Sequence, residues 1–120
     1  MPITDAPIGG AFLIEDAKLE QTLTVEEMTA EDLLMAKTVE DFMRKEVLPL
    51  VEQIEAHDND LIKCLMQKAA ALGLLCASIP EVYGGLDLKK SVTALVAQSL
   101  ALEPSFSVSL GAHTSIGTLG

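Results

Sequence analysis

Apolar residues return at every third or fourth position through most of the chain after residue 28, which is the spacing of helices with one buried face. The first such segment covers residues 29–56. Thr29 and Asp32 at its start come close to a capping box, with a shorter carboxylate than usual. Pro49 falls inside the pattern, removes one amide donor and crowds the preceding turn, so we expect a kink or break near Leu48.

Three further segments have the same period. The second predicted helix covers residues 61–72, and Gly73 stands where a left-handed residue would end it. The third covers residues 89–102 and is broken by Glu103-Pro104-Ser105. The fourth is expected to begin near Ser105 or Phe106 and to be still running at Gly120.

Between the second and third helices, the segment IPEVYGGLDLKKS (residues 79–91) cannot be helical. Pro80 biases Ile79 toward an extended backbone. Gly84 and Gly85 provide a positive φ or a close approach of the backbone. The chain is therefore expected to turn here and then resume as a helix.

These elements predict an all-α fold, a bundle of about four helices over residues 26–120 preceded by an irregular N-terminal arm over residues 1–25. Hydrophobic residues make up 49% of the chain and aromatic residues only 3%. The core must therefore be built mainly from Leu, Ile, Val, Ala and Met, which favours packing of helix on helix.

The net charge of -10 disfavours binding to nucleic acids and to anionic membranes, because both need clustered basic residues. The first fifteen residues contain no Lys or Arg, unlike a signal peptide, and no apolar run is long enough to span a bilayer. Cys64 and Cys76 have no metal or redox spacing and lie in apolar segments, so we expect buried free thiols. Free thiols fit a reducing compartment, and we expect a cytoplasmic protein.

Residue chemistry gives no complete active site. Gly84-Gly85 belongs to no phosphate-binding motif and is interpreted as a turn. His57 is expected to be a solvated linker residue, His113 a hydrogen-bonded helix residue, and Tyr83 a loop anchor. No cluster of metal ligands is apparent, and the carboxylates of the first helix fit a solvated face. The small residues of the last segment permit either close helix packing or contact with a ligand, and packing is favoured somewhat.

Five segments, in the family order, resemble the N-terminal helical domain of the acyl-CoA dehydrogenases, over residues 26–120. Leu-Gly-Leu (72–74), Ile-Pro-Glu (79–81) and Gly-Gly-Leu (84–86) have the family spacing. EDFMRKEVLPLVEQIE (40–55) resembles the first family helix, and SLGAHTSIGTLG (109–120) resembles the fourth, especially in the long-chain branch. In the family, the segment from Ile-Pro-Glu to Gly-Gly-Leu is a structural elbow.

The resemblance implies a fragment of an FAD-dependent enzyme that dehydrogenates fatty acyl-CoA thioesters in β-oxidation. A catalytic Glu and most of the FAD and CoA sites would lie in middle β and C-terminal helical domains outside this chain, so the fragment itself is expected to be inactive. Implied partners are the acyl-CoA substrate, electron-transfer flavoprotein and further copies in a homo-oligomer. A related flavoenzyme such as an acyl-CoA oxidase, or a non-catalytic helical binding or assembly module, stays open as an alternative.

The resemblance also implies that the fourth helix lines the acyl cavity, through Val108, Ser109, Ala112 and Ile116. Packing against missing domains is the competing interpretation. The short side chain of Ala112 favours a medium or long acyl chain. Because apolar surface would be left uncovered, the fragment is expected to self-associate. The candidates for that surface are Leu110, Ile116, Leu119 and the apolar patch at residues 12–14.

Overall fold

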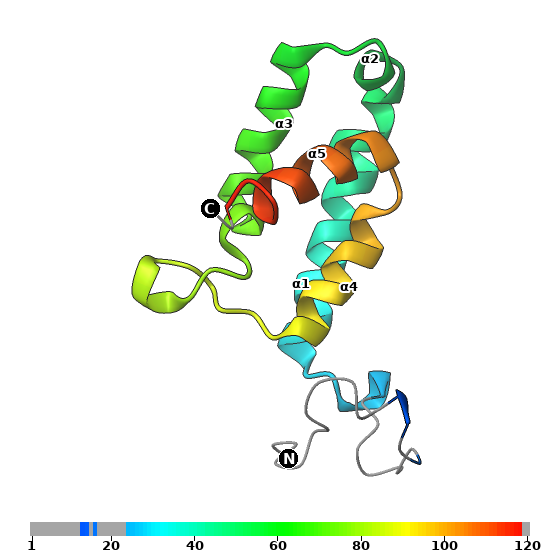
Figure 1. Cartoon of the computed structure of the whole chain (residues 1–120). Helices are drawn as coiled ribbons and strands as arrows, with labels where there is room; N and C mark the ends of the chain where they lie inside the picture. Colours follow the sequence, from blue (N-terminus) through cyan, green and yellow to red (C-terminus); the bar gives the residue numbers. More distant parts are fainter. Residues whose placement is uncertain (1–12, 15, 17–23, 119–120) are drawn as a thin grey trace.

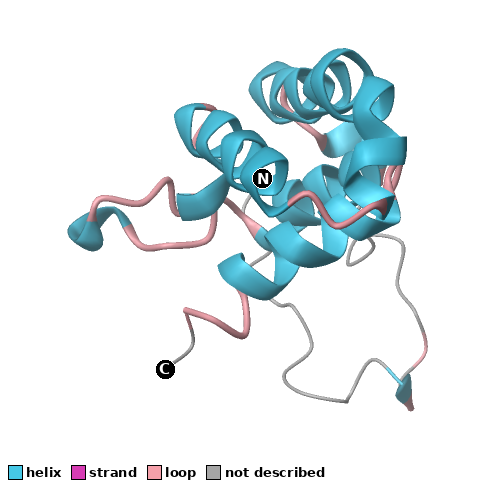
Figure 2. Ribbon diagram, turned by 90° about the horizontal axis from the view of Figure 1, so that it is seen from above, coloured by secondary structure: helices cyan, strands magenta, loops and turns pink. Residues whose placement is uncertain are grey.

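The computed structural model describes residues 13–14, 16 and 24–118. Every regular element in these residues is helical (Figure 2). The chain passes through η3 (Val25–Glu27), α1 (Ala30–Phe42), η4 (Met43–Val47), η5 (Leu48–Leu50), α2 (Val51–Glu55), α3 (Asn59–Ala71), η6 (Leu74–Cys76), η7 (Glu81–Tyr83), α4 (Lys90–Leu100) and α5 (Pro104–Thr114). The predicted all-α bundle of about four helices is confirmed, with α1 to α2 as one long, interrupted helix.

The long first helix changes its winding at the predicted place. Thr29 caps α1 by a complete capping box, in which its hydroxyl accepts from the Asp32 amide and the Asp32 carboxylate accepts from the Thr29 amide. After α1 the chain forms a π-helical turn (η4) and then a 3-10 turn (η5) that contains Pro49. Since Pro49 has no amide proton and crowds the preceding turn, the regular α-helical bonding is lost around it and returns in α2.

The helices pack as two columns with α5 across them (Figure 1). The α1 and α4 helices lie side by side, α3 runs back beside α1 and α2, and α5 crosses from the end of α4 toward α3. The buried core is shared by all these elements and consists of Val39, Phe42, Met43, Val47, Ile54, Leu65, Ala69, Leu74, Val96, Leu100, Phe106 and Leu110. The aromatic rings of Phe42 and Phe106 tie α1 to α5, with centroids 6.0 Å apart.

Two expectations about packing are wrong. The apolar period of residues 29–56 includes Leu33 and Leu34 and therefore predicts that they are buried. They are 45% and 63% exposed, because they lie in the first turns of α1 beyond the main core. Cys64 is exposed on α3 rather than buried, and Cys76 is partly buried with its thiol donating to the Gly73 carbonyl oxygen. Both cysteines are free.

Gly73 ends α3 as predicted, with a left-handed φ of 78°. The expected N-terminal arm lies mostly outside the described residues, as does Phe12 of the predicted apolar patch. Leu13 and Ile14 of that patch are exposed. Within the part of the chain that the structure describes, no helix has the length and apolar character needed to cross a bilayer.

Candidate functional site

The start of α5 is fixed by Glu103, a residue whose sequence context indicated only a helix break. Its backbone is extended, and its two carboxylate oxygens accept from the amides of Ser105 at 3.1 Å and Phe106 at 2.6 Å. Pro104 occupies the first turn, where a missing amide proton costs nothing. Glu103 is only 3% exposed, and it is the one buried polar residue among those the structure describes.

One side of α5 belongs to the core and the other is open. Phe106 and Leu110 are buried, whereas Val108 is 71% exposed and Ala112 is exposed. Val108 and Ala112 are four residues apart and therefore share a face. Ser109 is half-buried at its edge and donates to the Ser105 carbonyl oxygen at 3.0 Å. Three of the four predicted cavity residues thus come together on one helix.

The end of α5 differs from the prediction. The helix stops at Thr114 and does not continue to the end of the chain, since Ser115 has φ of -116° and ψ of -82°. A bond of 2.8 Å from the Gly117 amide to the Ala112 carbonyl oxygen closes the last turn. Ile116 consequently lies beyond the helix, 80% exposed, rather than on a continuing face. Leu110, expected at the surface, is a core residue.

Four hydroxyl groups of α5 and the turn after it make local bonds, those of Ser109, Thr114, Ser115 and Thr118. Ser115 donates to the Gly111 carbonyl oxygen at 2.6 Å, and Thr114 donates to that of Leu110 at 3.0 Å. Such bonds satisfy the small polar side chains inside their own helix. The side chains at this face can therefore shape a surface, but they do not form a nucleophile with an adjacent base.

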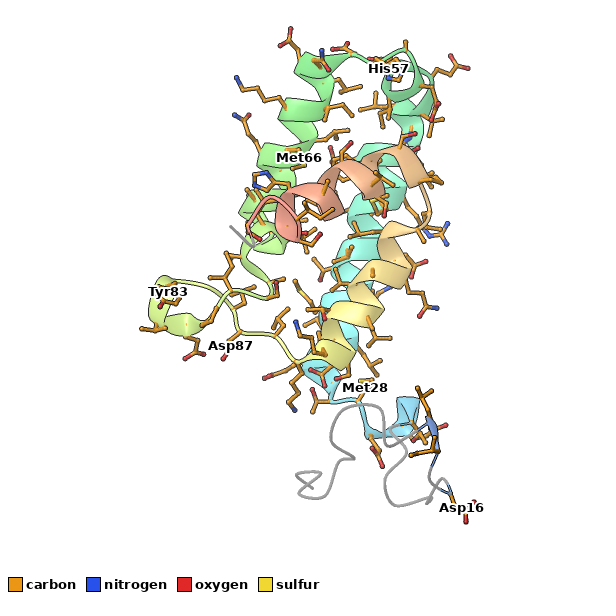
Figure 3. The ribbon with its side chains drawn as sticks, in the orientation of Figure 1. Asp16, Met28, His57, Met66, Tyr83 and Asp87 are labelled. Atoms are coloured by element: carbon orange, nitrogen blue, oxygen red, sulfur yellow. The ribbon has the colours of Figure 1, made fainter. Side chains whose placement is uncertain are left out.

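The elbow, residues 79–86, is a turn closed by backbone hydrogen bonds. The segment after the turn bonds back to the segment before it. The amides of Leu86, Asp87 and Leu88 donate to the carbonyl oxygens of Cys76, Ile79 and Ala77, respectively. Figure 3 shows Tyr83 at the projecting tip and Asp87 on the return. Tyr83 is 80% exposed, so its interpretation as a loop anchor is wrong. The turn interpretation of the two glycines is confirmed, since Gly84 has a φ of 81°.

A groove between α1 and α3 was not anticipated. It has a volume of about 370 Å³ and is lined by Thr38, Asp41, Phe42, Lys45, Glu46, Lys68, Ala71 and Leu72. Two ion pairs border it, Lys45 with Asp41 at 3.4 Å and Lys68 with Glu46 at 2.5 Å. The hydrogen bond with Glu46 raises the pKa of Lys68. Helical periodicity could not reveal this groove, because it depends on how two distant helices meet.

The described residues show no glycine-rich cradle for the pyrophosphate of a flavin nucleotide. Gly84 and Gly85 form the elbow rather than a phosphate cradle, and Arg44, Lys45 and Lys68 are already paired with carboxylates. His57 is exposed at the turn between α2 and α3, and His113 is exposed in the last turn of α5. In the described part of the chain, no group of three metal-ligating side chains comes together.

Comparison with known proteins finds matches to one enzyme family, the acyl-CoA dehydrogenases. Residues 29–120 match the family model described as acyl-CoA dehydrogenase, N-terminal domain. A probable acyl-CoA dehydrogenase of Bacillus subtilis (strain 168) is 45% identical over 115 residues, which are 96% of this chain and 19% of the relative. An acyl-CoA dehydrogenase of the same organism is 34% identical over 92 residues, 76% of this chain and 24% of the relative.

The fold agrees with these sequence matches. The crystal structure of an acyl-CoA dehydrogenase complexed with FAD from Bacillus anthracis superposes with a TM-score of 0.86 at 41% identity. The match covers 92% of this chain and 19% of that one, so the chain spans about a fifth of the length of these proteins. The chain belongs to the acyl-CoA dehydrogenase family, in which it corresponds to the N-terminal domain.

Proposed function

We propose that this chain is the N-terminal part of an FAD-dependent enzyme that dehydrogenates a fatty acyl-CoA thioester between its α and β carbons, as a step of fatty-acid β-oxidation. The observation that carries the proposal is the close match of both sequence and fold to acyl-CoA dehydrogenases, one of them in complex with FAD. The domain division at residues 25 and 26 is part of the same proposal, supported by the family match from residue 29.

The contribution of this domain would be to line part of the acyl cavity with the open side of α5. Val108 and Ala112 present an exposed apolar face, with Ser109 at its edge and Ile116 just beyond the helix. A saturated hydrocarbon chain needs an apolar, uncharged wall of this kind. The side chain of Ala112 is short, which leaves room for a medium or long acyl chain.

The reacting groups would come from elsewhere in the protein. FAD and the catalytic Glu are assigned to segments outside this stretch, and no reaction step is assigned to this domain. Electron-transfer flavoprotein would accept the electrons, and the enzyme would be a cytoplasmic homo-oligomer. The two free thiols support the proposed reducing compartment.

A visible spectrum of the protein expressed from its complete reading frame tests the proposal. We expect the absorption bands of bound FAD, and bleaching of these bands when a saturated acyl-CoA is added without oxygen. A 2,3-enoyl-CoA titrated in the same way is the control, because it has no α,β C–H pair left to dehydrogenate and should leave the flavin oxidised. A colourless protein that cannot be loaded with FAD would instead support a helical binding or assembly module.

The assignment of α5 is tested by Ala112→Leu in the same protein. The larger side chain should lower kcat/KM for the longest accepted acyl chains and leave that for shorter chains nearly unchanged, because it fills only the far part of the cavity. Ala97→Leu is the matched control, since Ala97 is an exposed alanine of α4. Equal effects of both variants on all chain lengths would contradict the assignment.

A further inference from the structure

The N-cap that Glu103 forms at the start of α5 differs from an ordinary helix N-cap. Helix N-caps are usually Ser, Thr, Asp or Asn, whose side chains satisfy one or two amides at a solvated helix end. Glu103 is buried, and its two oxygens bind the two successive amides of Ser105 and Phe106. A carboxylate that binds two amides fixes both the position and the direction of the first turn.

Two neighbouring contacts hold the same turn. The Ser105 hydroxyl bonds to the Glu55 carboxylate at 2.7 Å, which links α5 to the end of α2. Phe106 is fully buried and packs its ring against Phe42 of α1. The first turn of α5 is therefore clamped to two other elements, whereas the exposed side of the helix around Val108 and Ala112 has no partner among the described residues.

The direction of the first turn determines the position of the exposed side of α5, around Val108 and Ala112, because the helix connects the two. Ala112 is nine residues after Glu103, which places it about 13 Å further along the axis. A tilt of about 5° at the first turn would move Ala112 by roughly 1 Å over this length. Displacements of about this size at a binding surface are enough to change how a substrate fits.

We propose that Glu103 is a positioning residue that sets the acyl-chain selectivity of the α5 face by fixing the direction of this helix. The proposal rests on the proposed function, because it needs an acyl chain at Val108 and Ala112. Selectivity is the ratio of kcat/KM for a long acyl-CoA to kcat/KM for a short one. This ratio is measured on a single enzyme preparation, so a general loss of folded protein cancels from it.

The test compares Glu103→Gln and Glu103→Asp in the protein expressed from its complete reading frame. Glutamine keeps one acceptor oxygen but turns an amide group toward the second backbone N–H, so we expect the ratio to change by about threefold or more. Aspartate keeps both acceptor oxygens at a reach one methylene shorter, and should therefore change the ratio less than glutamine does. Thr29→Ala removes the cap of α1 and is the control, for which we expect an unchanged ratio.

Glu103→Ser keeps the measurement possible if the glutamine variant does not fold. Serine is a good N-cap but offers one oxygen at a shorter reach, so the helix should form with an altered direction and an altered ratio. Folded Glu103→Gln or Glu103→Ser enzyme with the wild-type ratio would overturn the proposal, as would an equal change in Thr29→Ala. If the wild type oxidises no acyl-CoA at all, the proposed function itself fails and this inference falls with it.

Discussion

The carbonyl oxygen of Ile79 lies 1.9 Å from the point where a β-carbon on Gly85 would stand. This contact occurs because the elbow doubles back closely, with the Asp87 amide bonded to the same carbonyl oxygen at 2.9 Å. Gly84 beside it has a different reason to be glycine. Its φ is 81°, which strains any L side chain, but a β-carbon there would meet nothing within 4 Å.

The two glycines should therefore differ in their response to the same substitution. We expect Gly85→Ala to lower the free energy of unfolding by about 3 kcal/mol, because backbone must move to make room. Gly84→Ala should lower it by only about 1 kcal/mol, the cost of a left-handed alanine. Urea unfolding of the 120-residue chain followed by circular dichroism measures both. A loss in Gly85→Ala no larger than about 1 kcal/mol would show that the backbone at the elbow moves apart easily and would contradict the prediction.

Phe106 and Val108 provide a similar pair on α5. Phe106→Ala removes a fully buried ring in contact with Phe42 and should cost about 3–5 kcal/mol of unfolding free energy. Val108→Ala, two residues later on the exposed side, should change stability by no more than about 0.5 kcal/mol. Urea titrations of the two variants measure both changes in unfolding free energy. A large loss in Val108→Ala would mean that this side chain is covered, against the exposed face described above.

Local signals in the sequence were sufficient to predict the structure where a residue type by itself restricts the backbone. Pro49 cannot donate a hydrogen bond, so the interruption of the first helix follows from its chemistry in any fold. Gly73 tolerates a positive φ, and α3 ends there. The family motifs succeeded for a related reason, because the residues of the elbow are fixed by the tight turn that they form.

Features that depend on neighbours in space were not predictable in this way. Leu33 and Leu34 fit the apolar period of α1 but are exposed. The period of one helix does not show how far along it the neighbouring helices extend. The sequence around Glu103 indicated only a helix break. No local signal indicates that both carboxylate oxygens of Glu103 are buried and bind the amides that follow. The end of α5 at Thr114 was also missed, since apolar and small residues continue beyond it.

The capping box of α1 should give a pH-dependent contribution to stability. The hydrogen bond from the Thr29 amide, followed by that from the Thr29 hydroxyl, lowers the pKa of Asp32 below its ordinary value of 3.8. A carboxyl group with a lowered folded pKa stabilises the fold above its unfolded pKa and loses that effect as the pH falls through the folded pKa. The contribution of Asp32 should therefore be complete near neutral pH, begin to fall near pH 3.8 and be lost as the pH falls through the lower pKa of the folded state.

Comparison of the wild type with Asp32→Asn isolates this effect, because the other carboxyl groups titrate in both proteins. The wild type should be more stable at neutral pH, and the difference in unfolding free energy should shrink steadily as the solution is acidified below the ordinary pKa of aspartate. Thermal melts over a pH series provide the measurement. A difference that is constant with pH would mean that the Asp32 charge contributes nothing to the cap.

The exposed side of α5 should make the isolated chain self-associate. Val108 and Ile116 are more than two-thirds exposed, and such apolar surface drives association when nothing covers it. Light scattering at rising protein concentration should show species larger than the monomer, and Val108→Ser combined with Ile116→Ser should reduce them. Val82→Ser at the equally exposed elbow tip is the control. If the control disperses the assemblies and the α5 variant does not, the elbow is the associating surface. A monomer at all concentrations would contradict association through either surface.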